Sequence, residues 1–198
     1  PILFTGIRFG LLTIMLVGFL RIPKVLVVPL LKIGLVMGAG MDLALYLSIA
    51  LAENTASIAV FSKLEVPFAL LLGVILLGER IGPRRIAGIS IAMIGAIIIT
   101  FDPLAFRDLP ALFWMGVSCA FAAFGFIQVR KLTKVHPFTI VAWISVVSAP
   151  ILLTTSLVFE DNHLQVVREA TWIGWSALGY TAIMSSVVAN SGLYYLLQ

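Results

Sequence analysis

Charged residues are scarce in this sequence. Asp, Glu, Lys and Arg make up 11% of the 198 residues, whereas hydrophobic residues make up 61%. An ordinary soluble domain is about one quarter charged, so this chain has too few polar side chains to cover a globule in water. We therefore expect an integral membrane protein. A cleaved signal peptide does not account for the composition, because apolar runs continue to the last residues.

Residues that bind metals or act in catalysis are also few. The sequence has one cysteine, Cys119, and two histidines, His136 and His163, which stand apart at the edges of apolar runs. A metal site needs several ligands close together, so we expect neither a metal nor a cofactor. An enzyme is not expected, since no predicted span holds a histidine and neither GxSxG nor HExxH occurs. The net charge of +4 forms no continuous basic face, which argues against nucleic-acid binding.

Long apolar runs are what the sequence has in abundance. A helix needs about 20 apolar residues to cross a bilayer. Seven runs reach this length, at about 2–20, 30–52, 54–78, 83–101, 110–129, 137–159 and 172–197. They are continuously apolar and lack the period of two that the strands of a membrane β-barrel would show. The predicted fold is all-α, a polytopic bundle of about seven transmembrane helices.

The basic residues predict how these helices are oriented. Nine Lys and Arg residues fall in alternate loops, at 21–32, 79–85 and 130–136, whereas the loops on the other side hold two. Loops rich in Lys and Arg face the cytoplasm. We therefore expect these three loops to be cytoplasmic and the protein to lie in the inner (plasma) membrane as a multi-pass protein.

Four ionisable residues fall inside predicted spans: Arg8, Asp42, Lys63 and Glu65. An isolated charge at the centre of a bilayer costs at least about 2.5–3.5 kcal/mol, and at about 1.5 Å per residue all four lie near the midplane. Two interpretations stay open. The charges either pair and hold helices together, or line a cavity that binds substrate or carries a coupling proton. Tyr46, one turn from Asp42, would reach the same cavity or pack in the core.

Two prolines interrupt predicted spans. Lys63 and Glu65 are about 200° apart around an ideal helix, so they face one cavity only if the helix is distorted. Pro67 supplies a reason for distortion, because it cannot donate to the carbonyl of Lys63 and its ring crowds that carbonyl. Pro150 lies similarly within the sixth run. We predict that Pro67 and Pro150 are helix hinges.

Glycines spaced by four residues occur in the first two runs. Gly6 and Gly10 form one pair, and Gly34 and Gly38 form another. In lipid, small residues at this spacing allow two helix backbones to approach closely. These glycines therefore predict contacts between helices.

The stretch LLGVILLGERIGPRRIAGISIAMIGAIIIT resembles the EamA domain of the drug/metabolite transporter superfamily. The pattern is a proline-bearing span that ends in leucines and LGER, a tight basic turn, and a span of small residues with spaced glycines. It is carried here by Pro67, Leu76, Leu77, Gly78, Glu79, Arg80, Gly88 and Gly95. The match covers residues 54–101, and residues 110–198 resemble the later helices through weaker motifs. The family commonly has proline directly after the position of Glu65, whereas Val66 intervenes here.

The resemblance implies two inverted repeats of five helices, an arrangement typical of transporters. On that template the chain is a fragment covering helices two to eight of ten. Residues 1–101 form the first repeat without its first helix, and residues 110–198 form the second without its last two. A weak internal echo, LYLSIALA in the second run and LYYLLQ in the seventh, agrees with a repeat. The implied function is a secondary transporter that exports small metabolites, amino acids or drugs by alternating access.

The expected partners are a small-molecule substrate and the lipid bilayer, and a homodimer is left open. Two rival functions also stay open. The span count suggests a seven-span receptor, although residues 172–197 lack the lysine that a retinal-binding type would place in its last span. A passive channel would use the same polar cavity, and saturable, gradient-coupled flux would separate it from a transporter.

Overall fold

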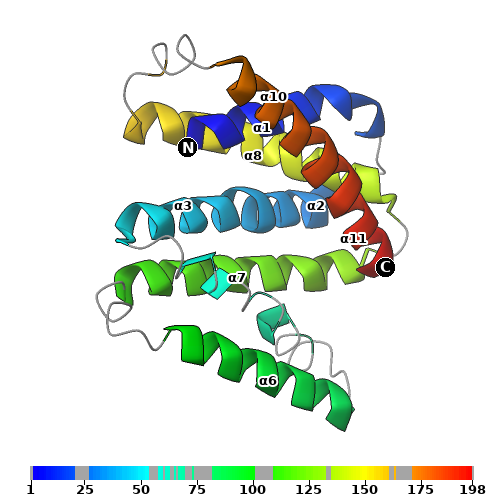
Figure 1. The fold of residues 1–198 in the computed structure, drawn as a ribbon. Coiled ribbons are helices and arrows are strands. Elements are labelled where there is room, and N and C mark those ends of the chain that lie inside the picture. The colour runs from blue at the N-terminus through cyan, green and yellow to red at the C-terminus, as the bar shows by residue number, and fades with distance from the viewer. Residues whose placement is uncertain are drawn as a thin grey trace. The chain divides into compact units, whose positions relative to one another are not determined.

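The computed structural model describes residues 2–20, 27–53, 58–59, 61–62, 65, 67–69, 73, 82–100, 109–132, 135–160, 163 and 171–197. The regular structure in these ranges is helical (Figure 1). The elements are α1 (Ile2–Met15), η1 (Val17–Phe19), α2 (Val27–Ile33), η3 (Gly34–Gly40), α3 (Met41–Leu51), α6 (Pro83–Thr100), α7 (Leu109–Arg130), α8 (Pro137–Phe159), α10 (Trp172–Tyr180), η6 (Thr181–Ala189) and α11 (Asn190–Leu197). The prediction of an all-α fold is confirmed.

Three described helices are long and apolar enough to cross a membrane. They are the continuous helix Val27–Leu51, α7 and α8, with 25, 22 and 23 residues. Six of the seven predicted runs coincide with described helices. The predicted bounds of α8 are the observed ones, and those of α7 differ by one residue at each end. The run predicted at 54–78 lies mostly outside the described residues.

The chain forms two compact units, described separately below. The first contains Pro1–Ala39 and Gln128–Gln198, and the second contains Gly40–Ile127. The predicted repeats at 1–101 and 110–198 stay a prediction, because a repeat is defined by internal symmetry and not by compactness.

In the first unit, α8 packs against most of the other helices. It packs against α1, α2, η6 and α11, and Figure 1 shows α1 running alongside it. Leu12 of α1 is buried in this unit, as are Ile140 and Leu152 of α8. The sequence of α8 is apolar on all sides, as expected of a helix whose exposed side would face lipid.

The glycines of η3 allow close packing against α8. A Cβ atom at Gly34 would lie 2.7 Å from Cβ of Val147, and one at Gly38 would overlap the Oγ atom of Ser148. The Ser148 hydroxyl donates a hydrogen bond to the carbonyl of Gly34, with 3.2 Å between the two oxygens. This close approach, which any larger side chain would prevent, confirms the helix contact predicted for Gly34 and Gly38.

The first glycine pair gives a mixed result. A Cβ atom at Gly6 would lie 2.9 Å from Cδ2 of Leu153 on α8, so the predicted contact is confirmed there. Among the described residues, no atom lies within 4 Å of a Cβ atom at Gly10. Of the two glycines in α1, Gly6 therefore makes the predicted helix contact within the described residues and Gly10 does not.

A carboxylate from the end of α8 caps the start of α1. The N–H groups of Ile2 and Leu3 donate to Glu160 at 2.9 and 2.8 Å, and the Ser156 hydroxyl donates to the same carboxylate at 2.7 Å. Burial raises the pKa of Glu160, whereas the hydrogen bonds to its carboxylate, these three among them, favour the ionised form, and the net result is a pKa below its ordinary value. The carboxylate satisfies N–H groups that have no partner within the helix.

In the second unit, α3 and α7 run antiparallel. The Ser48 hydroxyl donates to the carbonyl of Ala111 at 2.7 Å, and the Ser118 hydroxyl donates to the carbonyl of Met41 at 2.9 Å. The later residue of α3 thus pairs with the earlier residue of α7, which is the antiparallel arrangement. A hydrophobic cluster fills the space beside them, with Ile58, Ala111, Leu112, Met115 and Cys119 buried and Leu45, Ala52, Phe61 and Phe68 packed around them.

Candidate functional site

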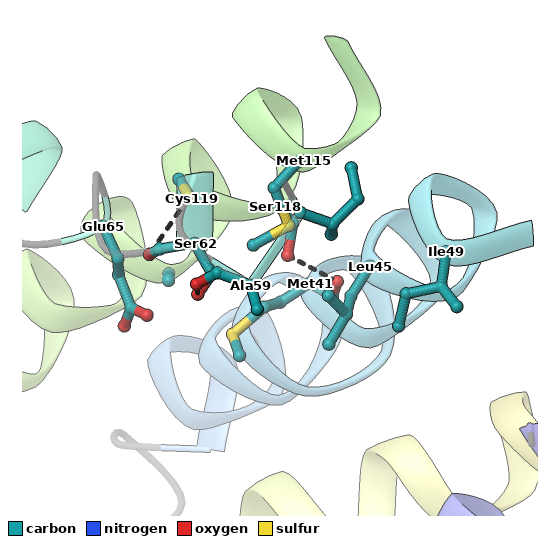
Figure 2. Close-up of a pocket in the computed structure, with 11 residues that line it drawn as sticks. Met41, Leu45, Ile49, Ala59, Ser62, Glu65, Met115, Ser118 and Cys119 are labelled. Atoms are coloured by element: carbon teal, nitrogen blue, oxygen red, sulfur yellow. Dashed lines mark hydrogen bonds between the residues drawn. The ribbon is translucent and has the colours of Figure 1, made fainter. Parts of the chain in front are cut away.

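A pocket of about 270 Å³ lies in the second unit (Figure 2). Its described walls come from α3, from four residues between positions 58 and 65, and from α7. The described lining residues are Met41, Leu45, Ile49, Ile58, Ala59, Ser62, Glu65, Met115, Ser118, Cys119 and Ala122. Figure 2 shows Met41, Leu45 and Ile49 on one helix, with Glu65, Ser62 and Cys119 grouped toward the other end of the pocket.

Each segment contributes residues at helical spacing. The residues from α3 recur every four positions, and those from α7 are at 115, 118, 119 and 122. Those of the third segment are at 58, 59, 62 and 65. Residues three and four apart share a face of a helix, so one face from each segment forms the walls.

Among the described lining residues, Glu65 is the one that carries a carboxyl group. The neutral polar groups are Ser62, Ser118 and Cys119. Their hydrogens point to backbone carbonyls, those of Ala59, Met41 and Ser62, at 2.7, 2.9 and 3.8 Å respectively. The serine oxygens keep lone pairs that can accept a hydrogen bond, so these side chains present acceptors to the pocket.

The pocket lies between one end and the middle of its long helices. Met115 and Cys119 are six and ten residues beyond Leu109, the first residue of α7. At about 1.5 Å per residue, this places them about 9 and 15 Å into a helix of the length needed to cross a bilayer. Glu65 lines the same pocket as this part of α7.

Asp42 and Tyr46 occupy a different face of α3. Asp42 is buried and Tyr46 is half-buried. Each follows a pocket residue, Met41 or Leu45, and successive residues are rotated by about 100° around a helix. Neither is among the described residues that line the pocket. The two share one face, as their spacing predicts, but that face is adjacent to the face that lines the pocket.

The other predicted site residues are not brought into this pocket. Arg8 is half-buried on α1 in the first unit, with its guanidinium carbon 5.0 Å from the ring centroid of Phe9. Asp42 and Glu65 belong to the second unit. The predicted cavity shared by Arg8, Asp42 and Glu65 therefore stays a prediction. Lys63 lies outside the described residues. Pro67 is buried, whereas Pro150 is exposed inside α8, which continues to Phe159.

Sequence reasoning did not identify Ser62, Ser118 or Cys119 as pocket residues. It examined ionisable groups inside the spans and considered the cysteine only as a possible metal ligand. The available signal was the spacing of Met115, Ser118 and Cys119, which places two polar side chains on one face of an otherwise apolar helix.

A second pocket, of about 360 Å³, lies in the first unit. Its described lining residues are His136, Pro137, Phe138, Val187, Val188, Ser191, Gly192 and Tyr195. His136 caps α8 by accepting a hydrogen bond from the Phe138 N–H at 3.3 Å, and its ring stacks on Phe19. Its described walls hold no carboxylate. Within the described ranges, no three His, Cys, Asp or Glu side chains lie close enough to hold a metal ion.

Comparison with known proteins finds one family and two curated relatives that are similar to this chain. Residues 109–198 match the EamA-like transporter family. A protein of Escherichia coli (strain K12) named "Probable amino-acid metabolite efflux pump" is 25% identical over 198 residues, which cover 95% of this chain and 66% of that protein. A protein of the same name from Salmonella typhimurium (strain LT2) is 26% identical over 171 residues, which cover 83% and 57%. The chain thus spans less than two thirds of the length of each of these two curated relatives.

The family match falls on the part of the chain that contains α7, α8, α10, η6 and α11, where the sequence motifs are weaker than those at 54–101. The family and the two relatives are transporters and not enzymes, in agreement with the sequence prediction. Together with the long apolar helices, they identify a multi-pass membrane protein. Residues 109–198 are thus similar to the EamA-like transporter family, which supports the resemblance to the drug/metabolite transporter superfamily found in the sequence.

Proposed function

We propose that the full-length protein is a secondary transporter of the plasma membrane that exports a small metabolite by alternating access. The observation that carries this proposal is the pocket of the second unit. It places a carboxylate, Glu65, on the wall of a cavity formed by apolar helices long enough to cross a bilayer. An ionisable group at such depth is costly, and residues of this kind commonly mark paths for substrates, ions or protons. The names of the two relatives support export as the direction.

Each ionisable residue has a proposed role. Glu65 binds an amine of the substrate or carries a coupling proton, and Asp42, buried on the neighbouring face of α3, takes the other of these roles. Tyr46 lies one turn from Asp42 and positions it.

The basic residues and the prolines have further proposed roles. Arg8 or Lys63 would bind a substrate carboxylate. Pro67 and Pro150 would allow their helices to bend as access alternates. The loops at 21–32, 79–85 and 130–136 face the cytoplasm in this proposal.

Transport by the full-length protein tests the proposal. Cells that lack other exporters are loaded with amino-acid metabolites, and efflux is followed with the wild type and with Glu65→Gln and Asp42→Asn. Each substitution keeps the size of the side chain and removes its charge, so we expect efflux to fall at least tenfold. The control is Glu53→Gln, at an exposed glutamate beyond the end of α3.

The outcomes separate the rival functions. Saturable efflux that depends on an ion gradient supports a secondary transporter. Flux that rises linearly with concentration and ignores the gradient would favour a passive channel, and absence of flux with retained ligand binding would favour a receptor. Wild-type efflux in both carboxylate variants would remove the roles given to Glu65 and Asp42.

A further inference from the structure

We propose that the pocket of the first unit binds the head group of an anionic phospholipid. This is the pocket of about 360 Å³ whose described walls include His136, Phe138, Ser191 and Tyr195. The inference goes beyond the proposed function, because it does not depend on what the protein transports. The ligand class is a phosphate ester that carries a net negative charge and acyl chains.

The place of the pocket along α8 carries the first step. This helix has 23 residues, and at about 1.5 Å each they are enough to cross a hydrocarbon core of about 30 Å. His136 is its N-cap residue and Pro137 is its first residue, so the pocket lies at one edge of the hydrocarbon, where lipid head groups begin. The other described walls come from the end of η6 and from α11, which Figure 1 shows beside the start of α8.

Ser191 carries the second step. It is 7% exposed, it lines the pocket, and its Oγ atom has no hydrogen-bond partner. A serine inside a helix commonly donates to the carbonyl four residues earlier, as Ser145 does to Val141 at 2.8 Å. At the end of the π-helix η6, the carbonyl of Val187 accepts the N–H of Asn190 instead. A buried hydroxyl without a partner is costly, and an oxygen of a ligand in the pocket would supply the partner.

Two further side chains can donate to the same ligand. Nδ1 of His136 accepts the Phe138 N–H at 3.3 Å, so the ring hydrogen is on Nε2. The His136 ring is exposed, which leaves this N–H able to donate to a ligand. The Tyr195 hydroxyl is a third donor, one turn beyond Ser191 on α11. Phosphate and ester oxygens accept such hydrogen bonds, and tyrosine is enriched at the level of lipid head groups.

Charge favours an anion over a neutral ligand. The segments 109–159 and 171–198, which contain the described lining residues, hold Arg130, Lys131 and Lys134 and no Asp or Glu. Lys131 is exposed, five residues before His136. Basic residues beside a membrane helix attract anionic lipids, and in the proposed orientation this loop faces the negatively charged cytoplasmic leaflet.

The apolar walls favour a lipid over a soluble anion. Pro137, Phe138, Val187 and Val188 line the pocket together with the three donors. Val188 and Tyr195 are 56% and 74% exposed, on helices of a membrane protein, where an exposed apolar surface faces acyl chains. The volume of about 360 Å³ is within the range of small-molecule sites, about 300–1,000 Å³. It suits a head group whose acyl chains stay in the bilayer.

Thermal unfolding of the full-length protein in detergent tests the proposal. The midpoint, Tm, is measured with added phosphatidylglycerol, with phosphatidylcholine, which has no net charge, and with glycerol phosphate, which has the anion but no acyl chains. We expect phosphatidylglycerol at about ten times its Kd to raise Tm by about 3 °C, and each of the other two to raise it by less than about 1 °C.

Ser191→Ala removes the unpartnered hydroxyl. Because this hydroxyl has no partner in the protein, Tm without lipid should not fall. The affinity for phosphatidylglycerol, obtained from the concentration dependence of Tm, should fall about fivefold, the usual effect of one lost hydrogen bond. The control is Ser176→Ala, whose hydroxyl bonds within α10 and which should leave the affinity unchanged.

His136→Asn and His136→Asp form a second matched pair. Both side chains cap a helix well, so α8 should keep its start in either variant. Asparagine keeps an N–H donor, whereas aspartate replaces the donor with a negative charge. We expect His136→Asn to keep most of the affinity for phosphatidylglycerol and His136→Asp to lower it at least about tenfold.

Four outcomes would overturn the proposal. Equal stabilisation by phosphatidylcholine would remove the selectivity for an anion, and stabilisation by glycerol phosphate would assign the pocket to a soluble anion. An unchanged affinity in both Ser191→Ala and His136→Asp would place the bound lipid elsewhere. No shift with any lipid, as when another part of the full-length chain fills the pocket, would show that no lipid binds there. None of these outcomes changes the proposed function, which rests on the pocket of the second unit.

Discussion

Ser48 shows what one hydroxyl contributes inside the second unit. Its side chain is fully buried, and it donates to the carbonyl of Ala111 at 2.7 Å across the contact between α3 and α7. A buried hydrogen bond of this kind contributes about 1 kcal/mol, and the average between helices in a membrane is about 0.6 kcal/mol. Ser48→Ala should lower stability by this amount, seen as a lower Tm in detergent. Ser176→Ala is the control, because its exposed hydroxyl bonds within its own helix; an equal loss there would contradict the assignment.

Glu160 makes the start of α1 sensitive to acid. Its pKa is lowered in the folded protein, so its contribution to stability is complete above its ordinary pKa of 4.5 and is lost as the pH falls through the lowered value. Glu160→Gln should lower the free energy of unfolding at pH 7 by about 0.5–2 kcal/mol, the usual contribution of a helix cap. Unfolding measured from pH 7 to pH 3 should show less acid destabilisation in the variant than in the wild type. Parallel curves would exclude this role.

Sequence reasoning at this scale selected residues that are chemically unusual for their surroundings. Glu65 stood out as a charge in an apolar run, and it lines the pocket. Asp42 stood out equally, but the rotation of about 100° per residue turns it away from the face of Met41 and Leu45. Ser118 and Cys119 are ordinary in a membrane helix, so composition gave no reason to select them before the packing of α7 was known.

At the scale of elements, the contact of η3 with α8 depends on the absence of a side chain. Gly38→Ala would place a methyl group on the Oγ atom of Ser148, and overpacking of this kind costs about 1–3 kcal/mol. Gly10→Ala adds the same methyl group where the described chain leaves room, and should be neutral or stabilising, since alanine favours a helix by about 1 kcal/mol over glycine. The change in Tm of the two variants checks this, and equal effects would contradict the packing described.

The helices η3 and η6 are both π-helical, at Gly34–Gly40 and Thr181–Ala189. They lie in the second and seventh predicted runs, the two runs that share the weak echo in sequence. Segments of this type inside α-helices are frequent at functional sites. The length of the apolar runs predicted the helices around them but not the local change of winding, which depends on which carbonyl accepts a hydrogen bond from each N–H after packing.

At the scale of the whole molecule, the sequence predicted the helical class and most helix bounds because span length and apolar composition are local properties. The separation into units at Ala39 and Gly40 was not predicted, since it falls within one continuous helix. Nothing in the composition of that helix changes at the boundary. In the sequence, Gly38, next to the boundary, predicts helix contacts alone.

The orientation in the membrane gives a prediction for the intact protein. Two single-cysteine variants are made in a Cys119→Ser background. Lys131→Cys lies in a basic loop predicted to be cytoplasmic. Glu53→Cys follows the helix Val27–Leu51, whose other end adjoins the cytoplasmic loop 21–32, so it is predicted to lie outside the cell. Both positions are exposed. A membrane-impermeant maleimide added to intact cells should label Glu53→Cys and should label Lys131→Cys after the cells are opened. The opposite pattern would reverse the proposed topology.

The central claim is that substrate passes through the pocket of the second unit, and filling that pocket tests it most directly. Ala59 lines the pocket and is otherwise exposed, so Ala59→Trp would occupy its space without cutting into the buried cluster. Ala177 is exposed on α10, and Ala177→Trp is the matched control. Efflux of the transported metabolite is measured for both in the full-length protein at equal membrane abundance. The account predicts at least a tenfold loss for Ala59→Trp and wild-type efflux for Ala177→Trp; wild-type efflux by Ala59→Trp would contradict it.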